Sequence, residues 1–176
     1  VLCRAVVCRC RRLLCGSRFP GIAMGLWVWR NFRIEVPDDW EILQFMRDPD
    51  DGRCVWADRY QVRLEMSWRR LGGAPDMQRS LADYISKVKQ DGVIADAAEQ
   101  REGPWYGLVG HMGPLLNSRF MRYFRRESCM LQLVFLWPDG RDAQRERQVL
   151  RSVDDVPPRK GNTHRCIIAA STHTEG

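Results

Sequence analysis

Residues 127–138 read ESCMLQLVFLWP, the most apolar run of the chain, and no other stretch constrains the architecture as strongly. Its length, its aromatic side chains and its closing proline are typical of a β-strand rather than a helix. A strand that is apolar on both faces lies in the middle of a sheet, covered from either side. We therefore predict a central strand here, buried on both faces, with the other elements arranged around it.

Alternating apolar and polar side chains predict further strands on the N-terminal side of this run. Half-buried strands are expected over residues 27–36, 41–48, 53–58 and 61–70. Short turns rich in Pro, Asp and Gly separate them, which favours an antiparallel meander. Two more strands are predicted over residues 105–110 and 119–127, while residues 93–100 are compatible with either a strand or a helix.

Residues 77–90, MQRSLADYISKVKQ, have the pattern of an amphipathic helix. Apolar side chains three to four residues apart form one stripe, made of Met77, Leu81, Tyr84, Ile85 and Val88. Asp76 can cap the N-terminus of this helix, and Gly92 lies where it should end. A second helix is predicted from about Asp142 to Val153. Runs of strands with two separate helices predict an α+β fold, an antiparallel β-sheet with two helices packed on it.

The basic character of the chain lies at its two ends. The formal net charge is +6, of which residues 1–23 contribute +5 and residues 157–176 contribute +2, while residues 24–156 carry −1. A nearly neutral body offers no obvious surface for a phosphate backbone, so we do not expect a nucleic-acid partner. No apolar run approaches the roughly 18 residues of a membrane span, and we expect a cytoplasmic protein.

Residues 1–23 contain five arginines, four cysteines and no acid. Arginines interrupt their apolar runs, which excludes the continuous apolar centre of a secretory signal. A transit peptide would be richer in serine, and the spacing C-x4-C-x-C-x4-C differs from that of structural zinc sites. Because strand patterning begins at Met24, the first methionine, we expect residues 1–23 to be a disordered or non-native upstream segment. Residues 24–156 then form a single α/β sandwich domain, and residues 157–176 a disordered tail.

Two segments, FRIEVPDDWEI at residues 32–42 and LQLVFLWPDGRDAQRERQVLRSV at residues 131–153, carry a family resemblance. The first looks like the opening strand, turn and strand of PsbP-like and DcrB-like proteins. The second is similar to their closing strand, polar turn and final helix. The resemblance covers about residues 27–154 and implies a three-layer α/β/α sandwich. It also implies a non-catalytic role, since known members mostly bind protein partners. It carries over no functional residue, because the matching positions are structural.

The segment RFMRYFRRE at residues 119–127 is the strongest candidate for a binding surface, because such surfaces favour arginine and exposed aromatic side chains. In a strand, Arg119, Tyr123 and Arg125 share one face and Arg122 lies on the other. One face should remain exposed, since buried arginines need partners. The alternative is a solvated face whose arginines pair with neighbouring acids. The candidate binding residues are Arg119, Arg122, Tyr123, Arg125 and Trp105.

The seven tryptophans divide into two predicted groups by their positions. Four lie within or at the ends of strand patterns and are expected in the core: Trp40, Trp56, Trp68 and Trp137. Three lie at element ends or beside Gly and Pro, where large aromatic side chains often stay partly exposed: Trp27, Trp29 and Trp105.

Signals for catalysis are sparse. His111 is the one histidine of residues 24–156 and lies in GLVGHMG, a glycine-rich stretch that could form a ligand-binding loop. We predict no catalytic residue, no metal site and no cofactor. The expected function is non-catalytic binding of another protein, as an adaptor or chaperone-like module. The alternative is a small hydrolase or ligand-binding enzyme that uses the loop around His111. The sequence leaves the partner and the oligomeric state open.

Overall fold

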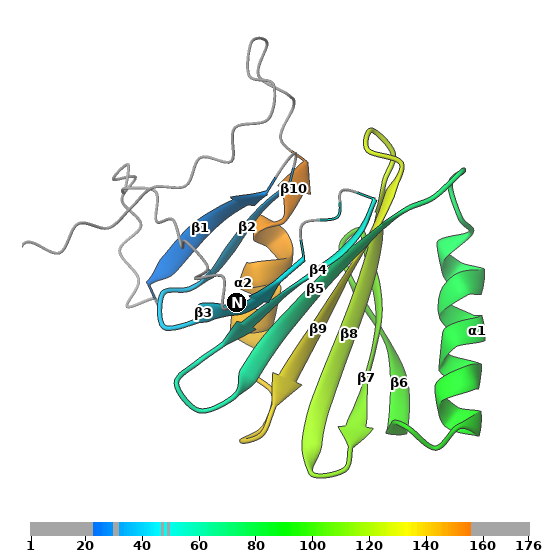
Figure 1. Cartoon of the computed structure of the whole chain (residues 1–176). Coiled ribbons are helices and arrows are strands. Elements are labelled where there is room, and N and C mark those ends of the chain that lie inside the picture. The colour runs from blue at the N-terminus through cyan, green and yellow to red at the C-terminus, as the bar shows by residue number, and fades with distance from the viewer. Residues whose placement is uncertain (1–22, 30–31, 47, 49, 156–176) are drawn as a thin grey trace, which may run out of the picture.

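The computed structural model describes residues 23–29, 32–46, 48 and 50–155, so the predictions for residues 1–22 and 156–176 lie outside it. The described chain folds into two antiparallel sheets and two helices (Figure 1). In chain order the elements are β1 (Met24–Trp29), β2 (Phe32–Pro37), β3 (Glu41–Phe45), β4 (Asp51–Ala57), β5 (Val62–Arg70), α1 (Met77–Gln90), β6 (Ala95–Glu102), β7 (Trp105–Met112), β8 (Leu115–Phe124), β9 (Cys129–Trp137), α2 (Ala143–Ser152) and β10 (Asp154–Asp155).

The larger sheet has seven strands in the order β3-β4-β5-β9-β8-β7-β6, with β9 in the middle. Leu133 of β9 pairs with Met66 of β5 on one side and with Phe120 of β8 on the other. The predicted central strand is therefore confirmed, and so is the predicted α+β fold with helices packed on an antiparallel sheet.

One detail of the prediction for β9 is wrong, because only one of its faces is fully buried. Leu131, Leu133, Phe135 and Trp137 are at most 3% exposed. The alternate side chains Met130, Gln132, Val134 and Leu136 are only half-buried. Their face is apolar by sequence, but neither described helix covers it.

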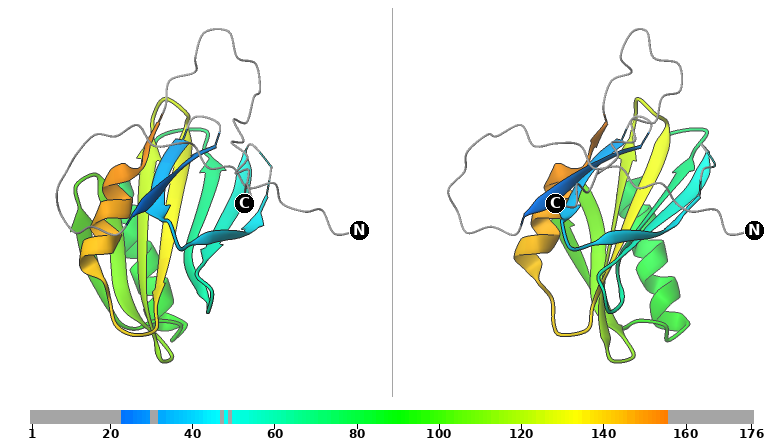
Figure 2. Two further views of the ribbon diagram at one scale, coloured as in Figure 1. Left: turned by 90° about the vertical axis from the view of Figure 1, so that its left-hand side faces the viewer. Right: turned by 60° about the vertical axis from the view of Figure 1, so that its left-hand side comes forward.

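The two helices lie on opposite faces of the larger sheet (Figure 2). Val88 of α1 packs with Leu108 of β7 and Ala97 of β6 in a small apolar cluster. Val149 and Leu150 of α2 belong to the main core on the other face. The main core contains most of the buried side chains, and α1 covers only the end of the sheet formed by β6, β7 and part of β8.

The smaller sheet has the order β1-β2-β10 and packs on the same face as α2. Residues 27–36 do not form the single predicted strand, because β1 pairs antiparallel with β2, with Trp29 opposite Phe32. The hairpin brings the tryptophans of β1 onto the core. Trp29 meets Phe45 edge-on at 4.4 Å between ring centroids, and Trp27 meets Trp56 at 6.5 Å.

Both predicted helices are confirmed, and so are the predicted cap and stop of the first. The side chain of Asp76 accepts a hydrogen bond of 3.1 Å from the backbone N–H of Arg79, and Gly92 follows α1 with a φ of +63°. A positive φ favours glycine because a side chain would crowd the backbone there. In α2 the side chain of Asp142 accepts from the backbone N–H of Arg145. The stretch left open between strand and helix is mostly the strand β6.

Candidate binding surface

One face of strand β8 belongs to the main core. The other face lies on the side of the sheet that carries α1. Phe120 and Phe124 are buried in the main core. Because side chains alternate along a strand, Arg119 and Tyr123 point to the opposite face, where both are half-buried. Arg125 follows the end of the strand and is exposed. Arg119 and Tyr123 therefore lie on the same face of β8, and Arg125 lies in the turn that follows the strand.

Arg119 connects the sheet to α1. Its Nη1 donates a hydrogen bond to the hydroxyl of Tyr84 on α1, and its Nε donates to Oδ1 of the buried Asn117 across 2.8 Å. No carboxylate of the described residues forms an ion pair with it. Arg119 therefore presents a fixed positive charge where α1 meets the uncovered part of the sheet.

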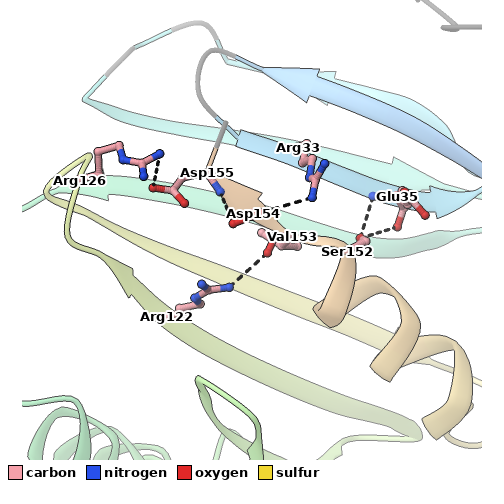
Figure 3. Close-up of polar contacts among 8 residues, drawn as sticks. All are labelled: Arg33, Glu35, Arg122, Arg126, Ser152, Val153, Asp154 and Asp155. Atoms are coloured by element: carbon pink, nitrogen blue, oxygen red, sulfur yellow. Dashed lines mark hydrogen bonds and ion pairs between the residues drawn. The ribbon is translucent and has the colours of Figure 1, made fainter. Parts of the chain in front are cut away.

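Arg122 lies on the other face of β8, where its contacts stabilise the fold. Its Nη1 donates a hydrogen bond of 3.2 Å to the carbonyl oxygen of Val153, and its guanidinium lies 4.3 Å from the ring centre of Phe124. Nearby, Arg126 pairs with Asp155 at 3.4 Å (Figure 3). Both arginines thus hold the segment between α2 and β10 against the larger sheet. Arg122 does not share a surface with Arg119 and Tyr123.

Trp105 is buried, at 1% exposure, so the prediction that it stays partly exposed is wrong. It begins β7 with its side chain directed into the main core, and its Nε1 donates a hydrogen bond of 3.0 Å to the carbonyl of Leu150 in α2. The predictions for the other tryptophans are confirmed. Four are at most 3% exposed (Trp40, Trp56, Trp68 and Trp137), and two are half-buried (Trp27 and Trp29).

His111 lies in β7, so the predicted glycine-rich loop is a strand. Its glycines allow close packing. A Cβ at Gly107 would lie 2.5 Å from the carbonyl oxygen of Arg119, and one at Gly110 would lie 2.6 Å from that of Ala95. The His111 side chain is 50% exposed, with Nδ1 3.9 Å from the exposed carboxylate of Asp96. Close strand packing, rather than a ligand, accounts for these glycines.

The half-buried side chains next to α1 form a continuous surface, which we call the open face. It consists of Arg119, Met121 and Tyr123 of β8, Met130, Gln132, Val134 and Leu136 of β9, and Glu65 and Ser67 of β5. One row across it places Glu65, Val134 and Arg119 on adjacent strands. Glu65 is paired with Arg53 at 2.5 Å, which leaves Arg119 as a charge of the open face without an acidic partner among the described residues.

Sequence reasoning missed the β9 and β5 side chains of the open face. From the sequence, all apolar side chains of β9 are expected in the core. The partial exposure of some of them depends on where α1 packs. The sequence does not specify which strands a helix covers. A usable signal was the small number of predicted helices, since one helix about 10 Å wide covers only about two strands spaced about 4.8 Å apart.

The two cysteines of the described residues do not resemble catalytic nucleophiles. Cys54 and Cys129 are 2% and 5% exposed. Burial raises the pKa of Cys54 to about 12 and that of Cys129 to about 11. Their thiols therefore remain protonated at neutral pH. Among the described residues, no three His, Cys, Asp or Glu side chains are grouped closely enough to hold a metal ion, and neither helix is long and apolar enough to span a membrane.

No family model and no curated protein matches this chain. Among solved structures, it is similar to a crystal structure of a protein from Bacteroides thetaiotaomicron VPI-5482, with 13% sequence identity and a TM-score of 0.42. The match covers 76% of this chain and 47% of the other, so the chain spans less than half the length of that protein. A similarity of this size gives no information about function.

Proposed function

We propose that this chain is a non-catalytic module that binds another protein through the open face. The observation that supports this proposal is the incomplete burial of one face of β9, the central strand of the sheet. Met130, Val134 and Leu136 lie there without a covering helix among the described residues. Apolar side chains that gather on a surface without being fully buried are typical of interaction sites, and methionine adapts readily to different partners.

The position of α1 favours a helix as the partner element. Packed helices lie about 8–10 Å apart, which is about two strand spacings of 4.8 Å. A helix placed beside α1 would therefore lie over β8 and β9. Its apolar side would meet Met121 and Val134. Because Arg119 lacks an acidic partner among the described residues, the partner helix should carry an acidic side chain opposite it.

The alternative, an enzyme that uses His111, has less support. A histidine catalyst needs a converging nucleophile or second titratable group in a site that excludes water. The pair of His111 and Asp96 lies on the surface, with the Asp96 side chain 87% exposed. A relation to PsbP-like and DcrB-like proteins would agree with a binding role. We keep that relation, and a cytoplasmic location, as parts of the proposal.

The proposal can be tested by partner capture with matched variants. Val134→Glu places a charge in the middle of the open face, where the side chain is only partly buried and the fold should tolerate it. Tagged full-length protein is incubated with an extract of the source cells, and bound proteins are quantified by mass spectrometry. A specific partner should be lost with Val134→Glu and retained with His111→Ala. Retention by both variants would contradict binding through the open face, and loss with His111→Ala alone would favour the enzyme.

A further inference from the structure

The strand β1 has a free edge without the features that usually protect one. Within the described residues it pairs with β2 on one side and with no strand on the other. Its sequence MGLWVW has no charge and no proline, and its register with β2 has no shift. The two edge strands of the larger sheet, β3 and β6, each contain a register shift. Bulges and charges are the usual means by which proteins prevent pairing at an edge, and β1 lacks both.

Exposed apolar side chains gather beside this edge. Of the six large apolar side chains that are exposed in the described chain, four lie on β1 or on β3 and the residue after it. They are Leu26 at 38%, Val28 at 47%, Leu43 at 67% and Met46 at 46% exposure. The strands β1 and β3 are in contact through Trp29 and Phe45, and both lie on the same side of the molecule (Figure 1).

We propose that β1 pairs antiparallel with β1 of a second copy of this chain, so that the two small sheets become one continuous sheet across a two-fold axis. This inference is independent of the open face, which belongs to the larger sheet. In the register that we propose, the two-fold axis passes at Trp27, so that Trp27 lies opposite its own counterpart. Leu26 then lies opposite Val28 of the second copy, on the outer face, and the same pair recurs by symmetry.

The charges on the neighbouring strand agree with this arrangement. Within one chain, Glu35 of β2 lies opposite Leu26, and Arg33 lies opposite Val28. In the joined sheet of six strands, two symmetry-related rows therefore run from Glu35 through Leu26 and the second copy's Val28 to its Arg33. Each of these two rows has an acid at one end, a base at the other and an apolar pair between them, while the row through Trp27 ends in Ile34 on both sides. No like charges face each other, so the edge is complementary to itself.

The test is the mass of the full-length protein in solution, measured by sedimentation equilibrium over a wide concentration range. The wild type should have the mass of two chains, and Val28→Lys should have the mass of one. Val93→Lys is the matched control, because Val93 is 46% exposed but lies away from β1, and it should remain a dimer. Leu26→Lys is a second variant of the edge, for use if Val28→Lys lowers the melting temperature.

A wild type that is monomeric at all concentrations would overturn the proposal. So would a Val28→Lys or Leu26→Lys protein that keeps the wild-type mass, because that would place the contact elsewhere. Dissociation by Val93→Lys as well would also overturn it, since it would show that any added surface charge breaks the dimer.

Discussion

Arg122 donates a hydrogen bond of 3.2 Å to the carbonyl oxygen of Val153, a residue 31 positions away. The bond crosses from β8 to the point where the chain leaves α2 and enters β10, and the pair of Arg126 and Asp155 supports the same connection. A guanidinium that satisfies a buried backbone carbonyl is part of the fold. Some arginines of residues 119–127 therefore stabilise the fold, and the others belong to the surface.

The first prediction compares Arg122→Ala with Arg125→Ala. Loss of Arg122 leaves the carbonyl of Val153 without its donor and removes the contact with Phe124, so the free energy of unfolding should fall by about 1–3 kcal/mol. Arg125 is exposed, and its replacement should leave the denaturation midpoint unchanged. Urea denaturation of both variants measures the difference. Equal denaturation midpoints of the two variants would show that the Arg122 hydrogen bond makes no measurable contribution to stability.

The second prediction compares the two faces of β9. Leu133 is fully buried, and Leu133→Ala should cost about 2–5 kcal/mol through lost contacts and the cavity left behind. Phe135→Ala should cost a similar amount. Val134→Ala, on the half-buried face, should cost distinctly less than either. Calorimetry of the three variants provides the comparison, and a cost at Val134 equal to that at Leu133 would mean that the open face is covered.

The third prediction concerns Glu146, a carboxylate with 0% exposure at the start of α2. It accepts hydrogen bonds from Arg141 and, at 3.3 Å, from Nε1 of Trp137. Glu146→Ala leaves the guanidinium and the indole N–H without an acceptor, so stability should fall by about 3–5 kcal/mol. Glu99→Ala, at an exposed carboxylate, is the control and should be close to neutral. A loss below about 1 kcal/mol for Glu146→Ala would contradict this structural role.

The fourth prediction follows from the raised thiol pKa values. A thiol with a higher pKa in the folded state binds its proton more tightly there than in the unfolded chain. The free energy of unfolding should therefore fall as pH rises from about 9 towards 12, the folded pKa of Cys54. Cys54→Ser should reduce this dependence when urea midpoints are measured at pH 8 and pH 10. An equal change of the urea midpoint between pH 8 and pH 10 in both proteins would contradict a contribution of the Cys54 thiol.

Much of the fold could be predicted from the sequence, because it depends on local patterns. The apolar run of β9, the period-2 alternation of β5 and the cap at Asp76 each specify an element. The predictions that failed depend on distant contacts. Trp105 is buried because α2 lies over it, and the glycines beside His111 serve close strand packing. The open face exists because α1 packs over β6 and β7, leaving the neighbouring strands uncovered.

The most direct test of the proposed binding role is site-specific photo-crosslinking in cells. A photoreactive amino acid replaces Gln132, which lies in the middle of the open face, and in a control replaces Gln148, exposed on α2. Position 132 should form crosslinks to another protein, within a segment that has helical apolar periodicity and acidic residues, and position 148 should not. Equal labelling from both positions, or no partner at position 132, would contradict the account.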